Sequence, residues 1–178
     1  KECDESVYLI VEPKIYAELN CDTEMQLNTE YIFDASSSNA DRGIVTYRFN
    51  FGDGISFAGD SATCIHKYEE EGTYTVEMTV VDTAGKEETV VKNVVLSNDI
   101  VATINCLEAL GKKITILDSE QNKEIRISNG NILAEELVFD CLESGSTLRF
   151  FIPIALLTGK KVKFIGSEKL LSRGLSVY

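Results

Sequence analysis

The sequence contains very few of the residues on which several protein classes depend. Its 178 residues include no Trp, one His and two Pro. With no second His, a histidine-based metal site is excluded. No apolar run approaches the ~20 residues that a membrane-spanning helix needs. We therefore expect a folded chain with neither feature.

Positive charge is also scarce. Lys and Arg number 17 against 29 Asp and Glu, which gives a formal net charge of −12. An acidic chain without a basic stripe repels phosphate backbones, so no nucleic-acid partner is expected. The hydrophobic fraction of 44% and the charged fraction of 26% are typical of globular protein. The chain also lacks an N-x-[ST] sequon, and N-glycosylation is not expected.

The five cysteines are spaced too widely for a C-x-x-C redox or zinc motif. Bridges between Cys21 and Cys64 and between Cys106 and Cys141 are two alternatives, and burial as free thiols is a third. An odd count leaves at least one thiol unpaired or paired with another chain. The cysteines are Cys3, Cys21, Cys64, Cys106 and Cys141.

The pattern of apolar residues predicts strands throughout the chain. Over 73–82, Tyr74, Val76, Met78 and Val80 alternate with polar residues, and this period of two is typical of a half-buried strand. Short helical turns are predicted only at 107–110, 134–136 and 168–172. The other predicted strands are 7–11, 14–19, 30–34, 44–51, 89–96, 100–106, 113–117, 124–127, 137–139, 147–152 and 161–165.

The pattern pauses at Ser97-Asn98-Asp99, and this pause predicts a domain boundary near residue 98. The predicted fold class is all-β, with two small β-sandwich domains at residues 1–98 and 99–178. Because no Pro- or Ser-rich linker separates the halves, we expect them to be joined stiffly, strand to strand.

Five sequence blocks in the first half resemble the PKD (polycystic kidney disease) domain, an immunoglobulin-like module. The resemblance covers about residues 10–96, and the second half carries no block of this kind. Phe49 stands where the family usually has Trp, and Asn50 where it usually has Asp. The blocks are Phe33-Asp34-Ala35-Ser36-Ser37-Ser38, Asp41-Arg42-Gly43-Ile44 with Tyr47, Phe49-Asn50-Phe51-Gly52-Asp53-Gly54, His66-Lys67-Tyr68, and Gly72-Thr73-Tyr74-Thr75-Val76 ending at Asp82.

The resemblance implies a non-catalytic extracellular or cell-surface module for adhesion or for binding a glycan or a surface or matrix protein. A structural spacer or envelope unit, and an accessory domain of a larger secreted hydrolase, are the alternatives. A fold alone does not establish a function, so this functional inference also needs support from a specific site.

The Gly52-Asp53-Gly54 segment is predicted to be a structural turn. Glycines on both sides of Asp53 allow positive φ, and the carboxylate accepts nearby backbone N–H groups. Phe49 and Phe51 share one strand face and should fill the core. The remaining motif residues, His66, Tyr68 and Tyr74, are interpreted as packed structural residues.

Catalysis is not expected, because His66 has no partner motif and no G-x-S-x-G elbow exists. The resemblance does suggest calcium, because some family members bind it near the loop that follows Asp34. Asp34, Asn39 and Asp41 are the predicted ligands, and a solvated turn is the alternative. In the second half, Phe151 is predicted to lie opposite the core or in a second buried layer, and packing is the favoured interpretation.

Overall fold

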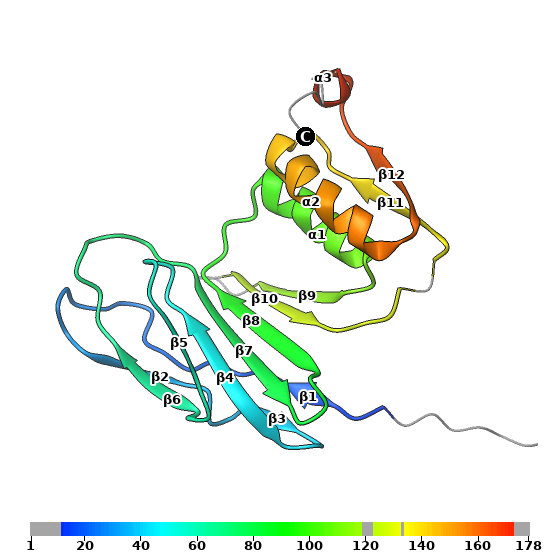
Figure 1. Ribbon diagram of the computed structural model, residues 1–178. Coiled ribbons are helices and arrows are strands. Elements are labelled where there is room, and N and C mark those ends of the chain that lie inside the picture. The colour runs from blue at the N-terminus through cyan, green and yellow to red at the C-terminus, as the bar shows by residue number, and fades with distance from the viewer. Residues whose placement is uncertain (1–11, 119–122, 133, 173–178) are drawn as a thin grey trace, which may run out of the picture.

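A computed structural model describes residues 12–118, 123–132 and 134–172, and a six-stranded antiparallel sheet runs through it (Figure 1). The strand order is β5-β4-β7-β8-β10-β9. The strands are β4 (Ile44–Asn50), β5 (Ser56–Gly59), β7 (Val76–Asp82), β8 (Glu87–Lys92), β9 (Lys113–Asp118) and β10 (Lys123–Ser128).

A second layer packs against the first part of this sheet. It consists of β2 (Tyr31–Asp34) paired with β6 (Thr63–His66), and of β1 (Ile15–Tyr16) paired with β3 (Asn39–Ala40). Between the layers lies an apolar core that includes Phe33, Phe49, Phe51, Met78 and Val80. The β-sandwich predicted for the first half is thus confirmed, while the strand predicted at 7–11 lies outside the described residues.

The second half places helices beside its strands. They are α1 (Asn98–Ala109), α2 (Gly145–Thr158) and the short α3 (Glu168–Leu171). β11 (Glu136–Asp140) and β12 (Lys161–Ile165) form a separate parallel pair that α2 connects. α1 packs against α2 and β11 (Figure 1). The core of this half includes Cys106, Leu137, Phe139, Leu148, Phe151 and Leu170.

Two predicted strands, 100–106 and 147–152, are wrong, because they lie in α1 and α2. Each helix begins at a serine N-cap: the Ile100 amide donates to the Ser97 side chain at 3.3 Å, and the Thr147 amide to Ser144 at 3.2 Å. Caps of this type favour helix initiation. Strands remain the main elements of the chain, so its mostly-β class holds.

In α2 the buried side chains follow a helical period, which explains the burial of Phe151. Leu148, Phe151 and Ala155 are buried, whereas Phe150 is 70% exposed. The side chains of neighbouring positions therefore do not alternate between two faces, as they would in a strand. Burial of Phe151 agrees with the packing interpretation, although Phe151 is part of a helix and not of the predicted strand.

The helical turn predicted at 134–136 is also wrong, because β11 begins at Glu136.

The sheet does not break at residue 98. β8 pairs with β7 on one side and with β10 on the other, so that Val90 lies opposite both Met78 and Arg126. The two halves are therefore joined by backbone hydrogen bonds between strands. The domain boundary near residue 98 stays a prediction.

Four cysteines are free thiols. Cys106 and Cys141 are fully buried with their sulfur atoms 4.0 Å apart, and burial raises the pKa of the Cys106 thiol to about 12. Cys21 and Cys64 are half-buried, and burial raises the pKa of both thiols. The structure thus shows the thiol alternative at these positions, while Cys3 lies outside the described residues.

Candidate functional site at the junction of the two halves

An ion cluster centred on Arg126 ties the two halves together. The Arg126 guanidinium donates to the Glu18 carboxylate at 2.8 Å and to the Ala17 carbonyl, and it lies 2.8 Å from a Glu124 oxygen. It also stacks over the Tyr16 ring, 4.4 Å from the centroid. Arg126 lies in β10 and Glu18 follows β1, so the cluster fixes the first-half segment against the second half.

Glu18 should make the stability of this junction depend on pH. The Tyr16 hydroxyl, which donates to Glu18, and the Arg126 guanidinium both hold the pKa of the Glu18 carboxyl below its usual 4.5. A lowered pKa in the folded state stabilises the fold above the unfolded value, and that contribution is lost as pH falls through the folded value. We expect Glu18→Gln to flatten the decline in melting temperature between about pH 5 and about pH 3. An unchanged decline in a pH series of thermal melts would contradict this.

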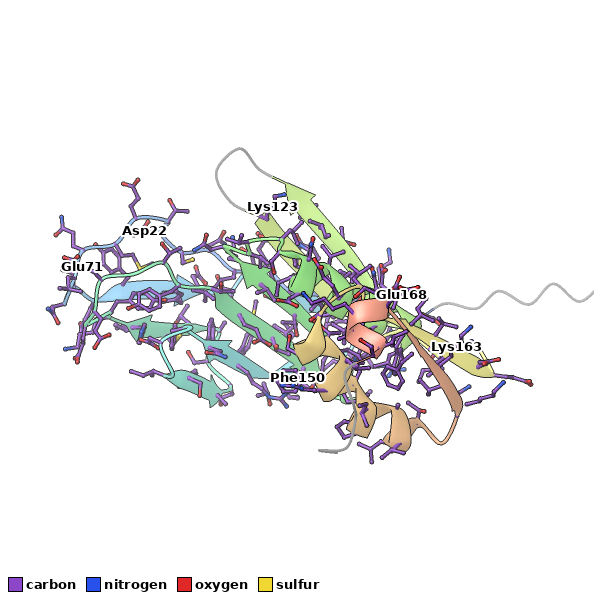
Figure 2. All side chains as sticks on the ribbon, turned by 90° about the horizontal axis from the view of Figure 1, so that it is seen from above. Asp22, Glu71, Lys123, Phe150, Lys163 and Glu168 are labelled. Atoms are coloured by element: carbon purple, nitrogen blue, oxygen red, sulfur yellow. The ribbon has the colours of Figure 1, made fainter. Side chains whose placement is uncertain are left out.

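A groove of about 770 Å³ opens beside this cluster. Its walls are the loop after Cys21, the segment 70–74 before β7, the end of β8, and the β9–β10 side of the second half. Figure 2 labels Asp22 and Glu71 on the first two and Lys123 on the last. The volume lies within the ~300–1,000 Å³ that is typical of small-ligand sites.

The groove joins an apolar floor to a polar rim. Phe33, Tyr68 and Val76 line the floor, and the Tyr68 ring stacks on Tyr74 at 4.2 Å. Tyr74 is held in place because its hydroxyl donates to the Glu70 carbonyl at 2.8 Å. The charged rim residues are Asp22, Glu70, Glu71, Glu124, Lys92 and Lys123.

Carboxylates outnumber ammonium groups at this rim, so the groove carries net negative charge. The Lys92 ammonium group lies 3.4 Å from the Glu124 carboxylate. A negative potential repels anionic ligands and accepts neutral or cationic ones. The lining thus offers mainly hydrogen-bond acceptors beside an apolar surface.

The Gly52-Asp53-Gly54 turn lies outside this groove and organises the first-half core. Gly52 and Gly54 have φ of 83° and 91°. Asp53 accepts from the Ile55 amide at 3.0 Å, and its other oxygen lies 2.8 Å from His66 Nε2. The His66 ring stacks on Phe51 at 3.9 Å.

The structure therefore places the motif residues in one packed unit. The Tyr68 hydroxyl donates to the Phe51 carbonyl at 3.0 Å, and Phe49 and Phe51 are buried. The His66 ring packs against the rings of Phe33, Phe51 and Tyr68. Nothing in the arrangement supplies a nucleophile.

The three predicted calcium ligands have different backbone partners. Asp34 pairs with Asn20 and accepts from the Ser36 amide at 2.8 Å, and the Ser36 side chain and amide hold its pKa below the usual range. Asn39 pairs with Tyr16 of β1.

Asp41 accepts from the Lys14 amide at 2.8 Å. In the part of the chain that the structure describes, no three His, Cys, Asp or Glu side chains form a metal-binding group. Calcium binding by this loop stays a prediction.

A smaller hollow of about 320 Å³ lies between the start of α1, Glu143 and the start of α3. The Thr103 and Thr147 hydroxyls are 3.0 Å apart, and Asn98 donates to the Glu143 carboxylate at 2.9 Å. Asp99 also lines the hollow. The Asp99 carboxylate, in the first turn of α1, offsets the partial positive charge of that helix N-terminus.

Comparison with known proteins finds a different family for each half of the chain. A PKD-domain family model matches residues 11–96, and the first half is a PKD domain. Among solved structures, the PKD1 domain of the Vibrio cholerae metalloprotease PrtV is 28% identical over 42% of this chain and 86% of its own, at a TM-score of 0.36. A carbohydrate-binding module of the β-sandwich superfamily is 29% identical over 44% of this chain and 32% of its own, at a TM-score of 0.40.

The second half gives the chain its family. The model for EPSP synthase (3-phosphoshikimate 1-carboxyvinyltransferase) matches residues 74–176, more than half of the chain, and the chain belongs to this family. The transferase of Clostridium novyi is 43% identical over 94 residues, and that of Clostridium perfringens strain SM101 is 44% identical over 95. These matches cover 49% and 52% of this chain but 22% of each relative. The chain thus spans about a fifth of the length of the curated relatives it matches.

Both family models include residues 74–96, which hold β7 and β8. The sequence indicates the PKD family through its blocks, but no comparable block in the second half predicts a family there. The serine caps at Ser97 and Ser144 were a usable signal of its helices, because Ser followed by a 3.6-residue apolar period marks a helix start.

Proposed function

We propose that the chain is a non-catalytic binding module whose junction groove takes a neutral glycan. The observation that carries the proposal is the groove itself, with an apolar floor against the Tyr68–Tyr74 stack and a rim of carboxylates. Sugar rings present C–H faces to apolar surfaces and hydroxyl donors to carboxylates. The acidic rim disfavours sulfated or uronic-acid polymers.

A screen of neutral and anionic polysaccharides against the full chain tests this. We expect saturable binding of neutral glycans only, and Glu71→Gln should weaken it about tenfold, since a hydrogen bond to a charged group contributes about 1.5–3 kcal/mol. Glu77→Gln is the matched control, because Glu77 is exposed on β7 outside the groove. Equal effects of the two variants, or preference for anionic polymers, would overturn the proposal.

Family membership supports a second function, in which the second half takes part in carboxyvinyl transfer to 3-phosphoshikimate. The supporting observation is 43% identity to the Clostridium novyi transferase over 94 residues. We propose that the 178 residues alone do not catalyse this transfer, because they span 22% of that relative. An assay with 3-phosphoshikimate and a carboxyvinyl donor, with that relative as positive control, should show no turnover by this chain.

An extracellular or cell-surface location is proposed from the PKD domain. No helix in the described ranges is long and apolar enough to cross a membrane. If no glycan binds to the folded chain, a spacer or envelope role becomes the better explanation of the first half.

A further inference from the structure

Cys106 and Cys141 form a buried pair of thiols in the core of the second half. Both side chains are fully buried, and their sulfur atoms lie 4.0 Å apart. Cys106 is part of α1, whereas Cys141 directly follows β11, so the pair bridges the contact between these two elements (Figure 1). The structure shows both residues as thiols.

The backbone that carries each thiol is fixed by hydrogen bonds. The Cys141 amide donates to the Ile165 carbonyl of β12 at 2.9 Å, and the Cys141 carbonyl accepts from the Ser144 amide at 2.8 Å. The Cys106 carbonyl accepts from the Leu110 amide at 3.1 Å. A disulfide needs the sulfur atoms to approach from 4.0 Å by about 2 Å. A change of side-chain rotamer moves a sulfur atom while this backbone stays in place.

The other contacts of the two thiols are weak. Cys106 Sγ lies 3.7 Å from the Asp140 carbonyl oxygen, and Cys141 Sγ lies 3.9 Å from the Phe139 carbonyl oxygen. Thiols are weak hydrogen-bond donors, so little is lost when these protons leave. Across the described ranges, no three His, Cys, Asp or Glu side chains form a metal-binding group. The pair therefore lacks the three or four protein ligands of a zinc site.

Cys21 and Cys64 provide an internal comparison in the first half. Asp34 of β2 pairs with Asn20 on one side and with Thr63 of β6 on the other. Cys21 and Cys64 follow these two partners in sequence, so β2 lies between the segments that carry them. Asn20 and Thr63 are thus two strand spacings apart, roughly 9.5 Å, whereas the Cα atoms of a disulfide lie within about 7 Å.

We propose that Cys106 and Cys141 are oxidised to a disulfide by a small-molecule disulfide, such as oxidised glutathione, while the chain folds. One cysteine thiolate attacks the small disulfide, which forms a mixed disulfide and releases one glutathione thiolate. The second cysteine thiolate attacks the protein sulfur of that mixed disulfide and releases the second glutathione thiolate. The two released thiolates take up the two protons that the cysteines lose. Two electrons pass from the cysteines to oxidised glutathione, which becomes two molecules of glutathione.

The disulfide attaches α1 covalently to the end of β11. Within the described residues, β11 and β12 pair only with each other, so no strand pairing joins them to the six-stranded sheet. Closure precedes complete burial, because burial raises the pKa of both thiols, to about 12 for Cys106, and leaves little reactive thiolate. The proposal is independent of glycan binding in the groove.

The test refolds the full, reduced chain from denaturant in equal concentrations of reduced and oxidised glutathione. The remaining thiols are then alkylated, and the digested chain is analysed by mass spectrometry. We expect a peptide pair that links Cys106 to Cys141 in most of the chain, with Cys21 and Cys64 alkylated. Alkylation of both Cys106 and Cys141 would overturn the proposal, and so would bridges from either of them to Cys3, Cys21 or Cys64.

Thermal melts give a second readout on the same material. The bond closes a loop between positions 35 apart, so its reduction by a phosphine should lower the melting temperature by roughly 5–15 °C. Cys106→Ala should abolish this redox-dependent shift, and the matched control Cys64→Ala should retain it. Equal shifts in the two variants would overturn the proposal. Because the linkage analysis uses the wild-type chain, the proposal stays testable if Cys106→Ala does not fold.

Discussion

Replacing Arg126 by Met is expected to destabilise the chain by about 3 kcal/mol, because removal of one partner from a buried ion cluster leaves its charges uncompensated. Arg126 is 14% exposed at the side chain, and its acidic partners Glu18 and Glu124 are 25% and 17% exposed. Met keeps most of the apolar volume, so the loss reports on charge rather than on packing. The free energy of unfolding in urea is the measurement.

Arg48→Met is the control for this experiment. Arg48 pairs with Glu87 at 2.9 Å, but the two side chains are 51% and 40% exposed. Exposed pairs contribute at most about 1 kcal/mol, so this variant should stay close to the wild type. Equal losses from the two replacements would show that the Arg126 cluster does not hold the halves together.

The Arg126 cluster also shows where sequence reasoning reaches its limit. Glu18 and Arg126 are 108 positions apart, and each is an ordinary surface residue by sequence pattern alone. Their contact depends on β10 pairing with β8, which no local pattern encodes. The groove beside them was not predicted for the same reason, because its walls come from segments of both halves that are far apart in sequence.

Residues close together in sequence gave better predictions. The alternation over 73–82 predicted β7, and the PKD blocks predicted the sandwich of the first half. Predictions from short apolar runs were wrong where the run fits both the two-residue period of a strand and the 3.6-residue period of a helix. In 147–152, alternate positions are apolar, but Ser144 caps a helix and the buried residues follow its turns. The cap should have decided between the two, since a strand does not need one.

Gly52→Ala is expected to destabilise the PKD domain by about 2–5 kcal/mol, because two costs add. The φ of 83° is unfavourable by about 1–2 kcal/mol for a residue with a Cβ. That Cβ would also lie 2.5 Å from the Thr75 carbonyl oxygen, a backbone atom that cannot move aside without displacing the entry to β7. Overpacking of this kind typically costs about 1–3 kcal/mol.

Gly54→Ala separates these two costs. Gly54 has a similar φ of 91°, but a Cβ there would meet nothing within 4 Å. Its replacement should therefore show the conformational cost alone, about 1–2 kcal/mol. A chemical-denaturation comparison of the two variants measures the difference, which we attribute to the approach of Thr75. If both variants lost the same stability, the turn would be selected for its backbone angle only, and the contact between Gly52 and the segment before β7 would not constrain the fold.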